Sequence, residues 1–313
     1  MDSIFSNTYT INRAKQLGFD LCGMVRCRPS GDAERVERWL SEGNNGSMEW
    51  FDRNKKQRYN PHELTEPNVE KSLIVCGVSY QLHEHKYSNL ASSYAHFSDY
   101  HITIKKMLNA LLGDLESKVG RSLNGRVYVD SAPLLERYWA KEAGFGWIGK
   151  NSMLVNRELG SMFFIGSLLV EGEFDFYNKP LEEDGCGDCR RCVDVCKNRA
   201  INTNRTINCN RCLSYITIEH KMPFSEEHKE IIKRGSDKVF GCDDCLKVCP
   251  WNIASSKKIE PSIGLKREEK LSFMAMPNQI DELKTYRLPK LSPLKRAGRK
   301  KIDAIIKILE ERE

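Results

Sequence analysis

The sequence contains no run of about 18 apolar residues, so nothing in it indicates a transmembrane helix. Its opening stretch, MDSIFSNTYTINRAKQLGFD, lacks a basic segment leading into an apolar one, which argues against a signal peptide. The glycines of GFGWIGK, residues 144–150, fit neither the G-x-G-x-x-G dinucleotide turn nor a P-loop. We therefore expect a cytoplasmic protein that uses neither motif to bind nucleotides.

The sequence does contain enough apolar residues for a substantial core. With 313 residues, 40% of them hydrophobic, the chain can form one large domain or two ordinary ones. The net charge of +6 is too small to indicate a nucleic-acid partner by itself. Residues 284–301, KTYRLPKLSPLKRAGRKK, however, carry eight Lys or Arg and no acid. Such a segment is either suited to phosphate contacts or simply a solvated surface.

Strand and helix patterns alternate over the first half of the chain. KSLIVCGVSY (71–80) and SMFFIGSLLVEGEF (161–174) read as strands, whereas HITIKKMLNALLGDLESKV (101–119) and APLLERYWAKEAG (132–144) read as helices. These patterns predict a domain of the α/β (α+β) class over residues 1–178. Cysteines crowd into residues 179–255, which we expect to form a second domain. Residues 256–313 are then a basic C-terminal tail that ends in a helix.

Seven of the twelve cysteines form two runs with ferredoxin spacing. CGDCRRCVDVC, from residue 186, has the pattern C-x₂-C-x₂-C-x₃-C, and CDDCLKVCP, from residue 242, has C-x₂-C-x₃-C-P. Two [4Fe–4S] clusters need eight thiolates, and these runs supply seven, so either Cys209 or Cys212 is the eighth. Structural zinc and disulfides are the alternatives, but zinc sites favour paired C-x₂-C units without the C-P ending.

The ferredoxin arrangement divides these cysteines between two clusters. One set is Cys186, Cys189, Cys192 and Cys249, and the other is Cys196, Cys242 and Cys245 with Cys209 or Cys212. The remaining three, Cys22, Cys27 and Cys76, are expected to be ordinary thiols of the first domain. Clusters transfer single electrons, so the first domain must hold a second redox centre or the substrate.

Three stretches carry a more specific signal: VDSAPLLERYWAKEAGFGWIGKNSMLV, RCLSYITIEHK and GCDDCLKVCPWN. In these stretches the chain resembles the epoxyqueuosine reductase family, which is similar in organisation to reductive dehalogenases. The resemblance implies a cobalamin-binding α/β domain followed by two [4Fe–4S] clusters. It also implies reduction of epoxyqueuosine to queuosine at the wobble position of tRNA, the last step of queuosine biosynthesis.

The resemblance also implies roles for individual residues. The proton donor of the family's D-[ST]-x-P motif matches Asp130, which also ends the strand pattern RVYVD, where sites of α/β proteins collect. Its alternative role is to cap the following helix, which Ser131 could do equally well. A general acid must hold a proton near neutral pH, so we expect burial beneath a corrin and substrate to raise the pKa of Asp130.

Cofactor ligands and partners follow from the same resemblance. The eighth cluster ligand aligns with Cys212, and the residues expected to contact cobalamin are Arg58, Asn151, Ser152, Leu154, Ser214 and Asp243. Asp99 and His101, in DYHITI, begin the D-x-H-x-x-G cobalamin motif, but Ile104 replaces its glycine, so we interpret the match as chance. The expected partners are the anticodon stem-loop of tRNA and an external low-potential electron donor, and we expect a monomer with no membrane partner.

Two other functions are compatible with iron–sulfur clusters. A reductive dehalogenase of small organohalides would share the cofactors, but its usual proton donor is Tyr where this motif has Asp130. A non-catalytic iron–sulfur electron-transfer protein would use the first domain for binding only. Failure of the reconstituted protein to bind cobalamin would favour this second alternative.

Overall fold

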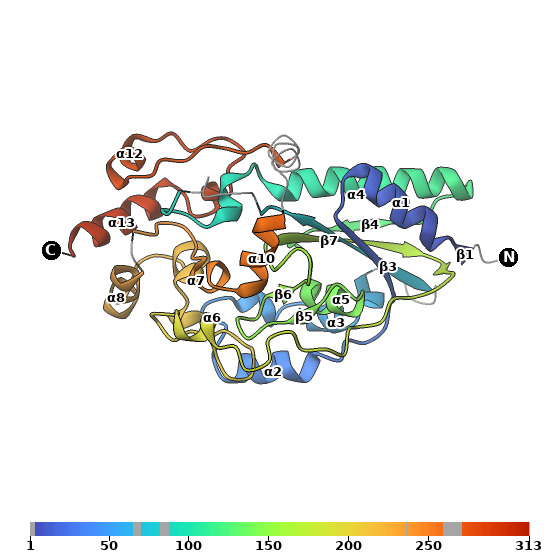
Figure 1. Cartoon of the computed structure of the whole chain (residues 1–313), viewed down its shortest axis with the longest axis horizontal. Helices are drawn as coiled ribbons and strands as arrows, with labels where there is room; N and C mark the ends of the chain where they lie inside the picture. Colours follow the sequence, from blue (N-terminus) through green and yellow to red (C-terminus); the bar gives the residue numbers. More distant parts are fainter. Residues whose placement is uncertain (1–3, 65–69, 82–87, 236, 259–270, 313) are drawn as a thin grey trace.

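The computed structural model describes residues 4–312, except 65–69, 82–87, 236 and 259–270. Strand β1 (Ile4–Phe5) and the last helix, α13 (Arg299–Glu310), lie at opposite ends of the long axis (Figure 1). The main sheet lies in the half of the molecule near β1, and short helices make up the half near α13. No helix among the described residues has both the length and the apolar character needed to cross a membrane.

The main sheet has four strands in the order β2 (Leu21–Arg26), β3 (Lys71–Ser79), β7 (Phe163–Glu171) and β4 (Arg126–Tyr128). Every neighbouring pair in it is antiparallel. The fold therefore takes the α+β form of the expected class. The strand predicted at RVYVD is observed as β4, an edge strand of this antiparallel sheet, and Asp130 follows it.

Strand β3 is buried along its whole length, as its apolar sequence predicts. Its alternate side chains face opposite sides of the sheet, because successive residues of a strand point in opposite directions. Ile74, Cys76 and Val78 belong to the core beneath α1 (Asn7–Leu17) and α4 (Tyr100–Val119). Leu73 and Val75 belong to the core on the other face, with Trp139 of α5 (Glu136–Glu142).

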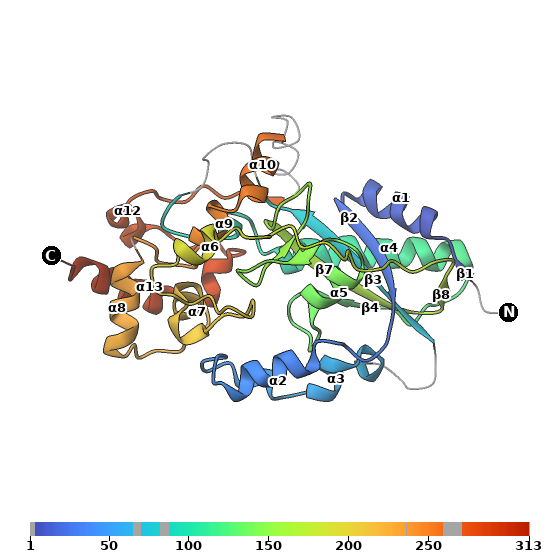
Figure 2. The ribbon, with the colours of Figure 1, turned by 60° about the horizontal axis from the view of Figure 1, so that its bottom comes forward.

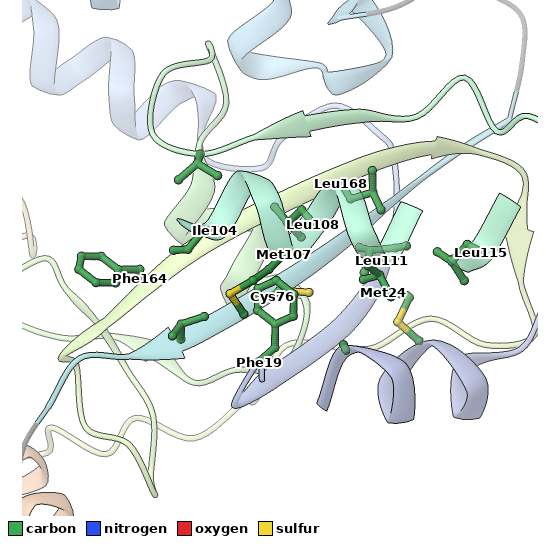
Figure 3. Packing of buried hydrophobic residues seen from close by; sticks show 14 of the residues in the cluster. Phe19, Met24, Cys76, Ile104, Met107, Leu108, Leu111, Leu115, Phe164 and Leu168 are labelled. Carbon is green, nitrogen blue, oxygen red and sulfur yellow. The ribbon is translucent and has the colours of Figure 1, made fainter. Parts of the chain in front are cut away.

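Helix α4 confirms the helix predicted over 101–119. The carboxylate of Asp99 accepts the His101 N–H at its start, and Gly120, with φ of 71°, ends it. Its buried side chains recur every three or four residues and pack onto the sheet (Figure 3): Ile104, Met107, Leu108, Leu111 and Leu115. This stripe fixes the first turn of α4, and therefore Tyr100 and His101, against the sheet.

Replacing Leu108 with Ala is expected to lower the free energy of unfolding by about 2–5 kcal/mol, because the fully buried side chain leaves a cavity. Urea unfolding followed by circular dichroism measures the change. Lys106→Ala, at an exposed position of the same helix, is the matched control and should change stability by less than about 0.5 kcal/mol. Equal effects of the two substitutions would contradict the packing described above.

The other elements of the first half are short. β1 pairs in parallel with β8 (Glu173–Phe174), and β5 (Trp147–Ile148) pairs antiparallel with β6 (Leu154–Val155). The helices are α2 (Ala33–Ser41), α3 (Lys55–Tyr59), and the 3₁₀ turns η1 (Glu49–Phe51), η2 (Pro61–Leu64) and η3 (Ser93–His96). Figure 2 shows α2 and α3 on the α5 side of the sheet. The predicted helix over 132–144 begins only at Glu136, after a bend through Ser131–Pro133.

The second half consists mainly of short helices around the cysteines. They are α6 (Arg191–Asp194), η4 (Cys209–Arg211), α7 (Leu213–Ile218), α8 (Glu226–Arg234), α9 (Asp244–Lys247), α10 (Pro250–Lys258), α12 (Ile280–Thr285) and η5 (Pro293–Arg296). Ile302 and Ile305 of α13 are buried in one core with Ile232 of α8 and Phe240. The described part of the tail thus contributes to the core of the second half, and residues 259–270 lie outside the described residues.

Candidate active site

A cavity of about 910 Å³ lies between the two halves of the molecule. Helix α2 helps to join these halves, because the Trp39 indole N–H donates to the Ile207 carbonyl at 2.7 Å. The charged side chains that line the cavity are Asp32, Arg35, Arg53, Arg58, Asp130, Glu136, Arg137, Glu219 and Arg296. The cavity therefore combines several cations with acids that could transfer protons.

Asp130 lies in the cavity wall, two residues after the end of β4. Its backbone adopts φ of 55°, a left-handed conformation that is uncommon outside glycine. Two contacts fix the residue there: its N–H donates to Glu136 Oε1 at 2.7 Å, and the Tyr100 hydroxyl donates to its Oδ2 at 2.8 Å. Glu136 of α5 therefore holds the backbone of Asp130, and Tyr100 of α4 holds its carboxyl group.

Two basic side chains also approach Asp130. His101 Nε2 lies 3.5 Å and Arg296 Nη1 3.7 Å from Asp130 Oδ2. Burial acts to raise the pKa of Asp130, but the hydrogen bonds from His101 and Tyr100 outweigh it and hold this pKa at about 2. These partners stabilise the carboxylate, and the raised pKa expected beneath a corrin and substrate stays a prediction.

Glu136 is the acid whose pKa is raised. Burial is the main cause, and the negative charge of Asp130 is the second, so the pKa of Glu136 reaches about 8. Arg296 lies on η5 and forms an ion pair with Glu219 at 2.9 Å. Asp130 thus lies near Glu136, an acid whose own neutral form is favoured, and near Arg296, a basic residue of the C-terminal segment.

Sequence reasoning missed most of these partners. Asp99 and His101 belong to the stretch interpreted as a chance match, yet the structure places His101 beside Asp130. The only signal for Glu136 was its position six residues after Asp130. Nothing in the sequence pointed to Arg296, which reaches the site through tertiary packing.

Three of the residues expected to contact cobalamin line the cavity: Arg58, Ser152 and Ser214. The Arg58 side chain is only 6% exposed, and its Nη2 donates to the Trp50 carbonyl at 2.8 Å. Its Nε is buried and has no hydrogen-bond partner among the described residues. A buried donor without a partner is costly, so the site fits a ligand that offers a polar acceptor, such as the amide groups around a corrin ring.

The other three expected contacts do not line the cavity. Leu154 is 2% exposed and packs in the core around Trp139. The Asp243 carboxylate, 5% exposed, accepts the Ser93 backbone N–H. The Asn151 amide donates to the Cys245 carbonyl at 3.4 Å, which places it beside the cysteines. These side chains position the walls around the cavity.

The structure gathers one set of cysteines away from the cavity. Burial raises the pKa of Cys192, and the neighbouring thiols of Cys186, Cys249 and Cys189 add to the shift. The Trp147 indole N–H donates to Cys186 Sγ at 3.4 Å. This is the set that the ferredoxin spacing predicts for one cluster, and the nearby indole donor suits a negatively charged cluster sulfur.

A second set of cysteines lies next to the cavity. Burial and the nearby Cys242 and Cys212 thiols raise the pKa of Cys245, and Cys212 in turn interacts with Cys196. The Ala200 N–H donates to Cys196 Sγ at 3.3 Å. Cys212 lines the cavity, so a cluster bound by this set would lie at its wall.

Cys209 also lines the cavity, and burial raises its pKa to about 12. Among the described residues, no group of three or more His, Cys, Asp or Glu side chains is arranged to hold a single metal ion. In a cubane cluster each thiolate binds a different iron, so the four thiolates lie farther apart than the ligands of one zinc ion.

Two family models match the chain. Residues 185–252 match the 4Fe-4S double cluster binding domain, and residues 58–131 match the model described as Epoxyqueuosine reductase QueG, DUF1730. The first match covers the cysteine sets, and the second ends just after Asp130. The two matches therefore include both cysteine sets and Asp130.

Solved structures share the fold. The structure of epoxyqueuosine reductase from Streptococcus thermophilus has a TM-score of 0.79 at 24% identity, over 97% of this chain and 80% of that one. A crystal structure of epoxyqueuosine reductase with an epoxyqueuosine-modified tRNA-Tyr stem loop also has a TM-score of 0.79 at 24% identity, over 96% of this chain and 80% of that one.

Curated relatives are more similar in sequence. The epoxyqueuosine reductase of Cyclobacterium marinum is 37% identical, over 80% of this chain and 81% of the relative. That of Xanthomonas campestris pv. campestris is 33% identical over 91% and 81%, and that of Escherichia coli K12 is 36% identical over 78% and 65%. The chain therefore belongs to the epoxyqueuosine reductase family.

Proposed function

We propose that this protein reduces epoxyqueuosine to queuosine at the wobble position of tRNA, the last step of queuosine biosynthesis. The proposal rests on the cavity, because Asp130 and Cys212 both line it. A proton donor and a cluster ligand thus face the same space. Two electrons and two protons enter the reaction, and the epoxide oxygen leaves as water.

The proposed cofactors are cobalamin in the cavity and two [4Fe–4S] clusters. Arg58, Ser152 and Ser214 would hold cobalamin, with the buried Arg58 Nε as a donor for its amide groups. Bound cobalamin would supply reducing electrons to the epoxide carbon. Asn151, Leu154 and Asp243 would support this site from behind the cavity wall, because their side chains do not line it.

We assign the cluster ligands from the two thiol sets. Cys186, Cys189, Cys192 and Cys249 would bind the outer cluster, and Cys196, Cys212, Cys242 and Cys245 would bind the cluster at the cavity wall. Electrons from an external low-potential donor would enter at the outer set and leave at the inner one. The protein would perform this transfer as a monomer.

Asp130 would be the general acid, because its carboxyl group is fixed at the cavity wall. Protonating the epoxide oxygen lets it leave as a hydroxyl group instead of a poorly leaving alkoxide. Tyr100 would hold Oδ2 in position through its 2.8 Å hydrogen bond.

The substrate would be the anticodon stem-loop of tRNA. Arg53 and Arg137 are exposed residues that line the cavity and can reach phosphates. Half of the basic residues in the C-terminal segment make other contacts within the protein. Lys301, for example, is buried and donates to the carbonyls of Ile218 and His220. The exposed cations of the segment that pair with no described acid are Arg287, Lys290, Lys295 and Lys300.

Replacing Lys290 and Lys295 with Gln is expected to weaken tRNA binding and to lower the slope of log affinity against log salt by about 0.7–0.9 for each phosphate that the variant no longer neutralises. Filter binding over a range of salt concentrations measures both quantities. Substitution is preferable to truncation because Leu294 and Ile302 are core residues. Lys106→Gln with Lys118→Gln on α4 is the control, and an unchanged slope in the test variant would exclude the segment from the interface.

The function is tested by nucleoside mass spectrometry of epoxyqueuosine-containing tRNA. The tRNA is incubated without oxygen with protein loaded with clusters and cobalamin and with a strong reductant. We expect conversion to queuosine that stops when cobalamin is omitted. No conversion by protein with both cofactors confirmed by spectroscopy would contradict the proposal.

A further inference from the structure

The free protein holds Asp130 in the wrong protonation state for an acid. Oδ2 accepts a hydrogen bond from Tyr100 and lies 3.5 Å from His101 Nε2 and 3.7 Å from Arg296 Nη1. These partners stabilise the carboxylate, whereas the proposed reaction needs the carboxylic acid. A proton must therefore reach Oδ2 when the substrate binds, from a group close to it.

His101 is well placed to be that group. Its Nδ1 lies 2.7 Å from Asp99 Oδ1, and the same oxygen accepts the His101 backbone N–H at 3.0 Å. The ring also stacks on Tyr100, with centroids 4.2 Å apart. Because Asp99 accepts the Nδ1 hydrogen, Nε2 is the nitrogen that can lose and regain a proton, and it faces Asp130.

We infer that His101 supplies the proton that turns Asp130 from a carboxylate into the general acid. The inference rests on the function proposed above. His101 acts through Asp130 and does not itself contact the substrate. The stretch DYH, interpreted from sequence as a chance match to a cobalamin motif, thereby has a role in proton supply.

The driving force is the removal of water. An imidazolium–carboxylate pair is stable while the cavity is hydrated, but covering the pair with substrate removes that hydration and favours the neutral imidazole and carboxylic acid. The Nε2–H bond breaks and an Oδ2–H bond forms. Asp130 then transfers this proton to the epoxide oxygen, and His101 regains a proton from solvent after the product leaves. The step moves one proton and no electrons.

The charged neighbours of the pair come from four segments: the start of α4, α5, the end of α7 and η5. Glu219, at the end of α7, interacts with Asp130. Asp99 raises the pKa of His101 from the start of α4, and Asp130 does so from the loop after β4. Arg296 of η5 and Glu136 of α5 act on Asp130. Glu136 is the other candidate for the proton source. Its Oε1, however, accepts the backbone N–H of Asp130.

The test is the pH dependence of single-turnover epoxyqueuosine reduction in the cofactor-loaded protein. In the wild type, activity should fall as pH rises through the apparent pKa of the His101–Asp130 pair. In His101→Gln, that fall should move at least about one unit toward acid, and activity at about pH 8 should drop about tenfold. Added imidazole should restore part of the loss.

Companion variants separate the alternatives. Asp99→Asn keeps a side chain that can cap the helix but removes the negative charge beside His101. It should therefore move the fall in activity toward acid by less than His101→Gln does. Glu136→Gln keeps an acceptor for the Asp130 N–H and removes a charge from beside it, so it should move the fall in activity by less than His101→Gln does. His228→Gln, a matched control on α8, should leave the fall unmoved. A merely structural role for His101 would lower the rate equally at every pH.

Each outcome bears on a different claim. An unmoved profile in both His101→Gln and Asp99→Asn, with wild-type conversion intact, would overturn the inference alone. A shift in Glu136→Gln as large as that in His101→Gln would assign the proton to Glu136. Absence of conversion by the wild type would refute the proposed function and this inference with it.

Discussion

Asp130→Asn is expected to slow epoxyqueuosine reduction by about a hundredfold to ten-thousandfold, the range that a positioned general acid contributes. Asparagine has the same shape, can still accept the Tyr100 hydrogen bond, and tolerates the left-handed backbone at φ of 55°. It cannot, however, donate the proton that the epoxide oxygen needs. Single-turnover nucleoside mass spectrometry measures the effect.

The controls for this variant separate chemistry from assembly. Cobalamin absorbance and iron content should match the wild type, because Asp130 contacts neither cysteine set among the described residues. Asp281→Asn, an exposed acid paired with Lys284, is the matched substitution and should retain full activity. A rate within twofold of the wild type, with both cofactors bound, would refute the acid role of Asp130.

Cys212→Ala is expected to remove the cluster at the cavity wall, lowering bound iron from about eight to about four atoms per chain. Cys209→Ala should retain about eight atoms, because Cys245 lies close to Cys212 and Cys242 in the inner set. Cys212→Ala should also abolish reduction, since electrons from the outer cluster could no longer reach the cavity. Iron and labile-sulfide analysis after anaerobic reconstitution measures the difference.

The two cysteines are three residues apart and both line the cavity, so each variant controls for the other. Cys22→Ala, in β2 of the first half, is a further control and should change neither iron content nor activity. Iron loss in Cys209→Ala with full iron in Cys212→Ala would reverse the assignment. Iron loss in both would mean that neither thiol alone completes the cluster.

Features encoded in short stretches of sequence could be predicted well. Strand β3 is a continuous apolar run, and α4 has a clear helical stripe, so both were predicted from their own residues. The ferredoxin spacing likewise predicted the two thiol sets. In each case the residues that form the pattern also determine most of the local structure.

Features that depend on tertiary packing could not be predicted. Arg296 reaches Asp130 because η5 packs beside it, and no local pattern records that contact. Leu154 lies in the segment that matches the family motif, yet packing turns its side chain into the core. The partners of Asp130 could not be predicted for the same reason: His101, Tyr100 and Arg296 come from distant segments, and their effect on its pKa outweighs burial.

The position of Arg296 has a consequence for the life of the protein in the cell. The segment that completes the charge environment of the active site also contains Ile302, Ile305 and Leu309, which complete the core of the second half. Loss of these three side chains, at about 2–5 kcal/mol each, is comparable to the whole stability of an ordinary domain. A chain cut by a protease before η5 would therefore lose the core of its second half together with the basic residue beside Asp130.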